Sequence, residues 1–274
     1  MTYAANKIAV VTGAGSGIGR ALAIALNTQG CELYLSDINA SGLSETLSLL
    51  PQPSIPADTT VLDAADKDGM HAWAERIDSE KGRVDIVVNN AGVALMSTVE
   101  KTEYEDIEWL MGINFWGVVY GTKAFLPLLH RSPEANLINI SSVFGIISVP
   151  TQSAYNAAKF AVRGYTEALR QELTGTNIHV CCVHPGGIKT NIARSARGGD
   201  PNESPDERGD RFQKMAGTTP TSAAEQILHA AQRRKPRLLI GWDAKLLTMV
   251  SRLFPTGYPK LLALFIKTKG EDLI

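Results

Sequence analysis

The chain has 274 residues, of which 44% are hydrophobic and 20% charged, and its formal net charge at pH 7 is -1. This composition is ordinary for a globular protein with one large core, and the charge balance gives no case for a nucleic-acid partner. No apolar run reaches the roughly 18 residues of a membrane span, and the three cysteines form no disulfide framework. Because the N-terminus also lacks a signal-peptide pattern, we expect a cytoplasmic protein.

Short β-rich runs alternate with longer helical patterns along the chain. Strands are predicted over residues 7–12, 31–36, 56–62, 84–88, 135–141, 178–183 and 237–240. Helices are predicted over residues 17–29, 41–50, 64–80, 103–131, 153–174 and 221–233. Several strands are almost wholly apolar, as parallel strands buried on both faces are. The pattern predicts an α/β fold, a single-domain Rossmann-type, doubly wound parallel sheet of about seven strands flanked by helices.

The first predicted strand runs into a glycine-rich stretch, TGAGSGIG, at residues 12–19. In a doubly wound sheet, ligands bind at the carboxyl ends of the strands, and the following helix offers free N–H groups to a phosphate. Glycine lets the backbone approach a pyrophosphate closely. This stretch therefore predicts a dinucleotide site, and the alternative is a glycine-rich turn without a ligand.

Asp37 ends the second predicted strand, about 20 residues after the glycines. A carboxylate there can accept hydrogen bonds from the ribose hydroxyls of adenosine and would repel a 2′-phosphate. Neither Ile38 nor Asn39 is basic, and Ser16 within the glycine stretch is neutral. The sequence thus favours NAD over NADP, and the alternative is an aspartate that merely opens the next turn.

Tyr155 and Lys159 are four residues apart in a predicted helix, so they share one face. A lysine ammonium beside a phenol favours the phenolate and lowers the tyrosine pKa, which suits a general acid or base. Ser142, just after the strand at 135–141, is placed to hydrogen-bond a substrate oxygen. The alternative is a helix with a solvated tyrosine and lysine, since this spacing alone is common.

With these residues in view, the chain resembles the short-chain dehydrogenases/reductases, in their single-domain NAD(P)-dependent branch with TGxxxGxG and YxxxK motifs. The resemblance runs to about residue 240. The matching motifs occur in order: residues 12–19, Asn89-Asn90-Ala91-Gly92, Asn114 after Ile113, Ser142, Tyr155 with Lys159, and Pro185-Gly186 with Thr190.

The resemblance implies four catalytic residues. Tyr155 would be the acid or base, and Ser142 would orient the substrate oxygen. Lys159 would lower the pKa of Tyr155 and hold the nicotinamide ribose, while Asn114 would anchor a proton-relaying water. The implied cofactor-binding residues are Gly13, Ser16, Gly17, Ile18, Gly19, Asp37, Asp63, Asn90, Ala91, Gly92, Tyr155, Lys159, Pro185, Gly186, Ile188 and Thr190.

Two aspartates compete for the place beside the adenine, Asp58 and Asp63, and the spacing to Asn89 favours Asp63. No metal site is expected, because none of the five histidines stands at metal-ligand spacing from another ligand residue. His184, which precedes Pro185, is interpreted as a structural histidine.

We expect residues 1–240 to form the Rossmann-fold dinucleotide-binding and catalytic domain and residues 241–274 to be its apolar C-terminal extension. The polar stretch 195–220 shows no apolar periodicity and is expected to be irregular, with residues 191–220 as a substrate lid. The extension should pack over the cleft or a subunit interface, and the alternative is contact with a membrane surface.

The residues near Ser142 and Tyr155 are apolar, which favours a lipophilic secondary alcohol or ketone as the small-molecule substrate. The expected function is hydride transfer between NAD(H) and that substrate. The alternatives are an NADPH-dependent 3-oxoacyl reductase of the same fold and a non-catalytic NAD-binding module. The resemblance also implies a homodimer or homotetramer, formed through residues 103–131 and 153–174.

Overall fold

The computed structural model describes residues 3–261. Its strands are β1 (Ile8–Thr12), β2 (Glu32–Asp37), β3 (Ala57–Val61), β4 (Ile86–Asn89), β5 (Leu95–Met96), β6 (Ala135–Ile140), β7 (Ile178–Pro185), β8 (Arg197–Gly198) and β9 (Arg237–Ile240). Its α-helices are α1 (Gly17–Thr28), α2 (Ala40–Ser48), α3 (Lys67–Lys81), α4 (Tyr104–Met111), α5 (Gly117–His130), α6 (Ser153–Glu172), α7 (Pro205–Met215), α8 (Pro220–Gln232) and α9 (Trp242–Leu253). Short helical turns are η1 (Val99–Lys101), η2 (Gly112–Trp116) and η3 (Val143–Gly145).

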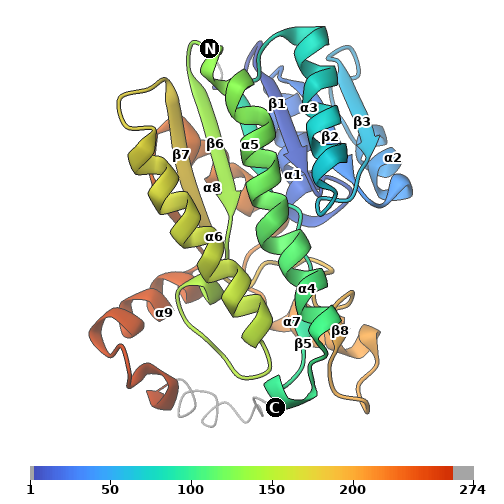
Figure 1. Ribbon diagram of the computed structural model, residues 1–274. Helices are drawn as coiled ribbons and strands as arrows, with labels where there is room; N and C mark the ends of the chain where they lie inside the picture. Colours follow the sequence, from blue (N-terminus) through green and yellow to red (C-terminus); the bar gives the residue numbers. More distant parts are fainter. Residues whose placement is uncertain (1–2, 262–274) are drawn as a thin grey trace.

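Seven strands form one parallel sheet in the order β3-β2-β1-β4-β6-β7-β9. The order reverses between β1 and β4, and in doubly wound sheets a ligand crevice lies outside the strand ends at such a point. Figure 1 shows the sheet with α5 and α6 across its front and α8 behind it. The predicted α/β architecture of about seven parallel strands is confirmed.

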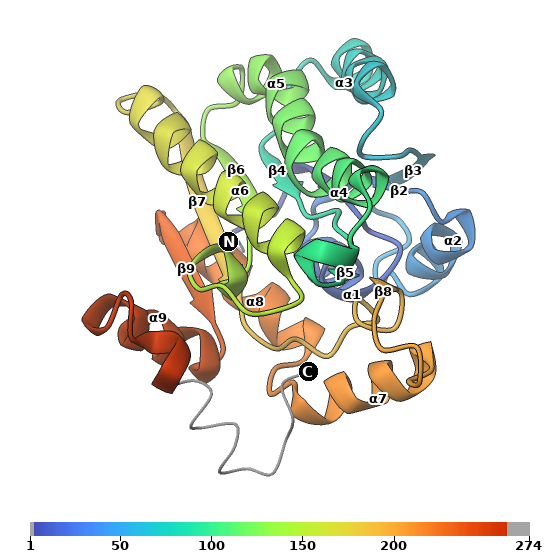
Figure 2. The same ribbon diagram turned by 60° about the horizontal axis from the view of Figure 1, so that its bottom comes forward.

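Two helical layers bury the two faces of the sheet (Figure 2). On one face, Leu22 of α1 and Ile227 of α8 pack against Val11 of β1. On the other face, Trp73 of α3 and Phe125 of α5 meet edge to face, with ring centroids 5.3 Å apart. Because alternate side chains of each strand enter opposite layers, the strands need apolar residues at nearly every position.

All seven predicted strands of the sheet exist, with ends shifted by at most a few residues. The helix predicted over residues 103–131 runs without a gap from Tyr104 to His130, through α4, the π-helical turn η2 and α5. The sequence pattern did not reveal that this middle turn, which contains Asn114, is π-helical.

The expectation that residues 195–220 are irregular is wrong. They contain β8, which pairs with β5, and the eleven-residue helix α7. Ser204 and Glu207 form a reciprocal capping box at the start of α7, with Pro205 next to the cap. The sequence therefore contained a signal for the start of this helix, but α7 has too few apolar residues to show a periodic apolar face.

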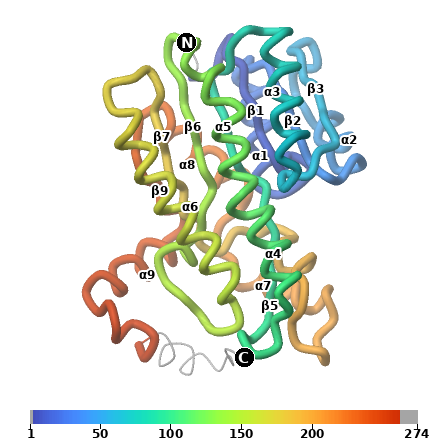
Figure 3. The backbone as a smooth tube through the Cα atoms, viewed as in Figure 1, coloured from blue at the N-terminus to red at the C-terminus, as the bar shows by residue number. Residues whose placement is uncertain are grey.

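The first part of the C-terminal extension is α9, which packs against the η3 region. Ala244 and Leu247 contact a cluster that includes Phe144 and Ile147, and the Tyr258 hydroxyl accepts a hydrogen bond from the Ser148 N–H at 2.9 Å. Figure 3 shows α4, α7 and α9, far apart in sequence, beyond the same end of the sheet. The extension past residue 261 lies outside the described residues. Within residues 3–261, none of the helices combines the length and apolar character that crossing a bilayer requires.

Candidate active site

The glycine stretch forms the turn between β1 and α1. Gly13 and Gly17 have positive φ angles of 67° and 54°, a conformation that side-chain-bearing residues rarely adopt. Gly17, Ile18 and Gly19 then form the first turn of α1. The Ser16 side chain makes no capping hydrogen bond, and the first turn contains no acidic residue. The helix N-terminus therefore keeps the free N–H groups that an anionic group needs.

The predicted motif after β4 holds this turn in place. The Asn90 side-chain amide donates to the Thr12 carbonyl at 2.9 Å and to the Gly13 carbonyl at 3.1 Å. In return, the Thr12 hydroxyl accepts from the backbone N–H groups of Asn90 and Ala91. The structure therefore brings the two motifs together, with Asn90 acting as a brace for the glycine turn.

Asp37 lies at the end of β2, facing the same turn. Its carboxylate accepts hydrogen bonds from the Gly15 N–H at 2.8 Å and from the Asn39 N–H at 2.9 Å. The carboxylate is thus fixed in position beside the glycine turn, with the exposed Ile38 next to it. A carboxylate held by backbone donors in this way can accept further hydrogen bonds through its remaining lone pairs.

Arg20 is a neighbour of this region that the sequence reasoning did not consider. Its guanidinium donates to the Gly15 carbonyl, to the Thr46 hydroxyl at 3.1 Å and to the Glu45 carboxylate at 2.7 Å. The guanidinium is therefore paired with Glu45 and hydrogen-bonded to the glycine turn. Its position directly after Gly19 was visible in the sequence, but its contact with α2 was not.

The two candidate aspartates after β2 occupy different places. Asp58 lies inside β3, opposite Tyr34, and its carboxylate pairs with Arg76 of α3 at 2.6 Å. Asp63 follows the end of β3, is exposed, and accepts a hydrogen bond from the Ala65 N–H at 2.9 Å. Because Leu62 donates to the Asp37 carbonyl, Asp63 lies at the same sheet edge as Asp37.

Tyr155, Ser142 and Lys159 come together beyond the ends of β6 and β7. Tyr155 lies in the first turn of α6, close to Ser142, which caps η3 and whose side chain lowers the Tyr155 pKa. The Tyr155 ring is packed edge to face against Phe144, with centroids 6.2 Å apart. The structure therefore places Ser142, Tyr155 and Lys159 near one another.

Lys159 is buried one turn along α6 from Tyr155. Its ammonium donates to the Ile140 carbonyl at 3.1 Å and lies 5.7 Å from the centroid of the Tyr155 ring. An added Cβ at Gly92 would lie 3.4 Å from the Lys159 Nζ and 3.2 Å from the Asn114 Oδ1. Lys159 and Asn114 therefore flank the same exposed glycine of the motif after β4.

The pKa values of this pair differ from the sequence-based expectation. Burial raises the pKa of Tyr155, and the hydrogen bond from Ser142 opposes that rise. Burial also lowers the pKa of Lys159 to about 8. In the protein alone, burial thus favours the neutral form of each group, and the lowering of the Tyr155 pKa by Lys159 is not what the structure shows.

Asn114 lies in the π-helical turn η2 and is fully buried. Its side-chain oxygen accepts from the Val93 N–H at 2.8 Å, and its amide donates to the Val93 carbonyl at 2.9 Å. These two bonds fix the chain just after Gly92. The π turns of helices are often found at functional sites, and this one presents Asn114 to the loop after β4.

Pro185 ends β7, and the loop that follows carries Gly186, Ile188 and Thr190. Thr190 reaches the glycine turn, since an added Cβ at Gly17 would lie 3.1 Å from its methyl group. Ile188 is buried and bridges to Thr218. The Asp243 carboxylate of α9 accepts from the Gly187 N–H at 2.7 Å. Sequence reasoning missed Asp243, because only the fold brings the C-terminal helix to this loop.

Buried polar residues next to the site support its walls. The Asn156 side chain accepts from the Val149 N–H and donates to the Phe144 carbonyl, both at 3.2 Å. His184 is fully buried, and its Nδ1 lies 2.9 Å from the Ser142 carbonyl. Burial lowers the His184 pKa to about 4, so its Nδ1–H donates from a neutral ring. His184 therefore positions the Ser142 backbone.

The segment predicted to be a lid is anchored beside the site. The buried Arg208 guanidinium donates to the carbonyls of Ala193, Gly198 and Ala196 at 2.7, 2.7 and 3.0 Å. Arg197 stacks on Trp109, with its guanidinium carbon 3.6 Å from the ring centroid. These contacts join the segment to itself and to α4.

No three His, Cys, Asp or Glu side chains in the described part of the chain come together as metal ligands. Tyr155 instead packs against an apolar cluster of the buried Leu95, Leu110, Ala154 and Ala158 with the partly buried Val93, Ile107, Trp109, Met111 and Phe115. The arrangement therefore offers a phenol, a hydroxyl and an ammonium in an apolar surround, next to an anion-binding turn.

Comparison with known proteins gives consistent matches over the same residues. Residues 7–200 match the family model for short chain dehydrogenase. "Putative oxidoreductase SadH" of Mycobacterium tuberculosis is 44% identical over 262 residues, covering 94% of each chain. A short-chain dehydrogenase/reductase from Burkholderia phymatum, solved in complex with NAD, is similar with a TM-score of 0.83 at 26% identity, covering 92% of this chain and 95% of that one. A short chain dehydrogenase from Mycobacterium paratuberculosis, bound to NAD, gives a TM-score of 0.75 at 25% identity, covering 87% and 97%.

Proposed function

The chain belongs to the short-chain dehydrogenase family of oxidoreductases, and from that premise we propose that it transfers a hydride between NAD(H) and a lipophilic secondary alcohol or ketone. The observation that carries the proposal is that Tyr155 lies beside Ser142 and one helical turn from Lys159, at the edge of the sheet that also bears the glycine turn.

The residues present fit a dinucleotide. The uncapped N-terminus of α1 leaves N–H groups for a pyrophosphate, and Asp37 provides fixed carboxylate oxygens for ribose hydroxyls. Ala91, Gly92, Ile188 and Thr190 would line the remainder of the site, and the place of Asp63 at the same edge supports its choice over Asp58. When bound, NAD(H) would donate or accept the hydride at its nicotinamide ring.

The protein's own residues would handle the proton. In reduction, the Tyr155 hydroxyl would give its proton to the carbonyl oxygen of the substrate, while the Ser142 hydroxyl donates a hydrogen bond to the same oxygen. In oxidation, the Tyr155 oxygen would take the proton of the alcohol. Lys159, held by the Ile140 carbonyl, would bind the ribose next to the nicotinamide and favour the phenolate when it is charged.

Several features support NAD over NADP. The Asp37 carboxylate would repel a 2′-phosphate at the adenosine ribose. Arg20, the basic side chain beside the glycine turn, is paired with Glu45 rather than directed outward. The absence of a free cation next to Asp37 among the described residues disfavours the NADPH-dependent 3-oxoacyl reductase.

The substrate class rests on the apolar surround of Tyr155. Phe144 meets the Tyr155 ring edge to face, and the buried Leu95 and Leu110 belong to the apolar cluster beside it. We assign residues 191–220, now seen to contain α7, as the lid over this wall, and α9 as an extension of the same domain. An apolar ketone would lose less solvation here than a charged metabolite.

We further place the enzyme in the cytoplasm as a homodimer or homotetramer. Cys31, Cys181 and Cys182 are free and buried, which suits a reducing compartment. Trp116 of η2 and Phe160 of α6 are exposed to 46% and 39% on the helices expected to associate. Exposed aromatic side chains of this kind often mark protein–protein contacts.

The test is the formation of NADH by the purified protein from secondary alcohols of increasing size, with NAD and NADP in parallel. We expect activity with NAD that grows with substrate hydrophobicity. The Asp37→Asn variant keeps an acceptor for the Gly15 N–H but loses the charge. The ratio of kcat/KM with NAD to kcat/KM with NADP should therefore fall about tenfold, which corresponds to about 1.4 kcal/mol. The exposed Asp68→Asn variant is the control and should leave the preference unchanged.

Activity with NADP alone in the wild type would contradict the assignment of NAD and support the 3-oxoacyl reductase. NAD binding without turnover on any alcohol or ketone would support the non-catalytic module instead.

A further inference from the structure

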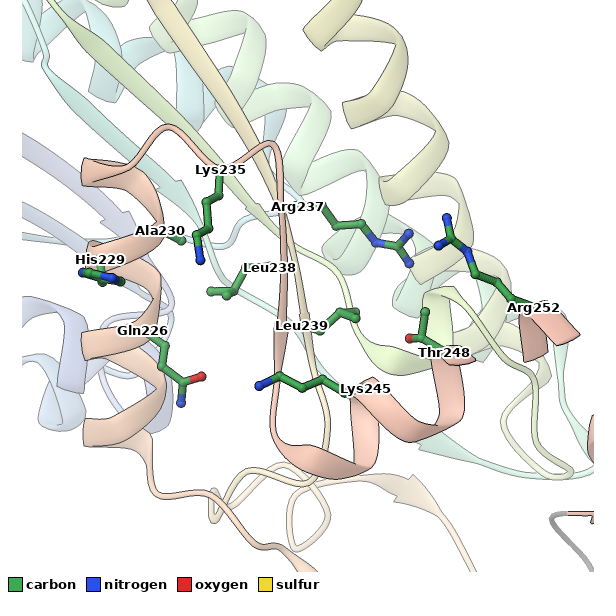
Figure 4. Close-up of a pocket in the computed structure, with 10 residues that line it drawn as sticks. All are labelled: Gln226, His229, Ala230, Lys235, Arg237, Leu238, Leu239, Lys245, Thr248 and Arg252. Atoms are coloured by element: carbon green, nitrogen blue, oxygen red, sulfur yellow. The ribbon is translucent and has the colours of Figure 1, made fainter. Parts of the chain in front are cut away.

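A cavity of about 540 Å³ lies between α8, β9 and α9, away from the residues assigned to hydride transfer. Four cationic side chains line it: Lys235, Arg237, Lys245 and Arg252. None of its lining residues is acidic. Figure 4 shows that the guanidinium groups of Arg237 and Arg252 point toward each other, with Lys235 and Lys245 on the other side of β9.

Within the described part of the chain, these cations have no carboxylate partners. Among residues 3–261, none of the four forms an ion pair. Glu167 lies near enough to influence Arg237 electrostatically, but it pairs with Arg163 at 3.1 Å. The Arg237 Nε is buried without a hydrogen-bond partner. Like charges gathered without a counter-charge favour binding of an anionic group.

The exposed face of α9 borders this cavity and is apolar. Trp242, Met249 and Leu253 are seven and four residues apart, so they lie on one face of the helix, and they are 65%, 55% and 66% exposed. On the opposite face, Ala244 and Thr248 are buried against the protein.

The cations and the apolar face are continuous. Lys245 and Arg252 belong to α9 and line the cavity, so they lie between its buried face and its exposed apolar face. Phe254, 53% exposed, extends the apolar face past the end of the helix. An apolar helix face with a tryptophan, bordered by lysine and arginine, is typical of helices that lie in a membrane interface.

We propose that α9 and the basic cavity dock this protein on a membrane surface that contains anionic lipid. Lipid phosphate groups enter the cavity between Arg237 and Arg252, and Trp242, Met249 and Leu253 insert among the acyl chains. A second copy of the chain fits less well, because a two-fold contact at α9 would bring like charges together. A free anion accounts for the cavity but leaves the apolar face unexplained.

The test is flotation of the purified protein with vesicles of phosphatidylcholine alone or mixed with phosphatidylglycerol. We expect binding to the anionic vesicles at about 0.1 M salt and much less at about 1 M, where charge is screened. Removing two surface cations in Lys245→Gln/Arg252→Gln should weaken this binding about 30-fold. The Trp242→Ala/Met249→Ser/Leu253→Ser variant should also lose it, with unchanged turnover in solution.

The matched control is Lys101→Gln/Lys123→Gln, which removes two exposed cations elsewhere and should bind vesicles as the wild type does. No flotation of the wild type, or equal loss in the control, would overturn the proposal. Binding of inorganic phosphate without flotation would identify a free-anion site instead. A fall in molar mass of the apolar-face variant, with no flotation of the wild type, would identify a contact between copies. None of these readouts depends on the substrate class or the cofactor.

Discussion

Burial favours the neutral form of both the Tyr155 side chain and the Lys159 side chain. The Tyr155 pKa is raised, and the Lys159 pKa is lowered to about 8. A neutral phenol is the form that the proposed mechanism needs to protonate a carbonyl, so under that proposal the protein alone favours reduction at neutral pH. Alcohol oxidation needs the phenolate and therefore calls for a higher pH or for a further positive charge in the site.

This arrangement predicts opposite pH dependences for the two directions. Alcohol oxidation should rise with pH into the alkaline range, whereas ketone reduction should stay level near neutrality and fall as the phenol ionises. The Ser142 side chain lowers the Tyr155 pKa. Ser142→Ala should therefore shift both the rise in oxidation and the fall in reduction to higher pH, and it should reduce turnover about 100-fold. Profiles of kcat/KM against pH check this, and an unmoved limb in the variant would contradict it.

Lys159 also predicts a dependence of stability on pH. Its pKa is lowered from 10.5 to about 8, so between these values the unfolded chain binds the proton that the folded protein has lost. The free energy of unfolding should therefore rise with pH across that window, by about 3 kcal/mol at most. Below pH 8 both states are protonated, and the cost of the buried charge is fully present.

Replacing Lys159 with methionine removes this titration. The Lys159→Met variant should be more stable than the wild type at pH 7, and the difference should shrink as the pH approaches 10.5. Urea unfolding of both proteins at several pH values gives the difference between their free energies of unfolding. The contributions of all other titrating groups are the same in both proteins and cancel in this difference. A difference that stays constant with pH would contradict the shifted lysine.

At the scale of elements, α9 is linked to the loop after β7 through one carboxylate. Asp243 in the first turn of α9 accepts from the Gly187 N–H, and an added Cβ at Gly186 would collide with the same carboxylate. The loop that would face the nicotinamide is thus positioned by the C-terminal helix. The structure gives α9 a role in shaping the site as well as an exposed outer face.

Removal of this carboxylate should loosen the loop. A hydrogen bond to a charged group contributes about 1.5–3 kcal/mol, so Asp243→Ala should weaken NADH binding by about tenfold or more. Asp243→Asn retains an acceptor and should recover most of the affinity. NADH fluorescence titration provides the measurement, and equal affinities in all three proteins would argue against a positioning role.

The segment that we propose as a lid is held by the buried cation of Arg208. Arg208 holds the carbonyls of Ala193, Ala196 and Gly198, and Arg208→Ala should release this part of the segment. We expect faster proteolysis after Glu203 and a higher KM for substrate, with unchanged NADH affinity. Arg211→Ala, which lies on the same helix as Arg208 and removes an ion pair with Glu203, is the control. Equal proteolysis of both variants would contradict the anchoring role of Arg208.

At the scale of the whole molecule, local patterns predicted the sheet well because its strands are buried on both faces. The TGxxxGxG stretch and the spacing of Tyr155 and Lys159 were also readable, since a turn and a helix each fix short-range geometry. Contacts between distant segments were not readable: Asp243 with Gly187, and Arg20 with Glu45, exist only once α9 and α2 are placed. Helix α7 was not predicted because it has too few apolar residues to show a helical periodicity, although its capping box was present in the sequence.

The charge distribution of the whole molecule also depends on the fold. A net charge of -1 conceals a cluster of cations around β9. Lys235, Arg237, Lys245 and Arg252 spread over 18 residues of sequence but share one cavity. Composition therefore excluded a strongly basic protein without excluding a basic surface.

The most direct test of the central claim follows the transferred hydrogen itself. A lipophilic secondary alcohol deuterated at its carbinol carbon is incubated with NAD and either the wild type or Tyr155→Phe, and the NADH is analysed by mass spectrometry. Each NADH formed by the wild type should carry one deuterium atom, transferred as deuteride. The variant should turn over at least about 100-fold more slowly while binding NADH equally well. Unlabelled NADH, or full turnover in Tyr155→Phe, would contradict hydride transfer with Tyr155 as the acid or base.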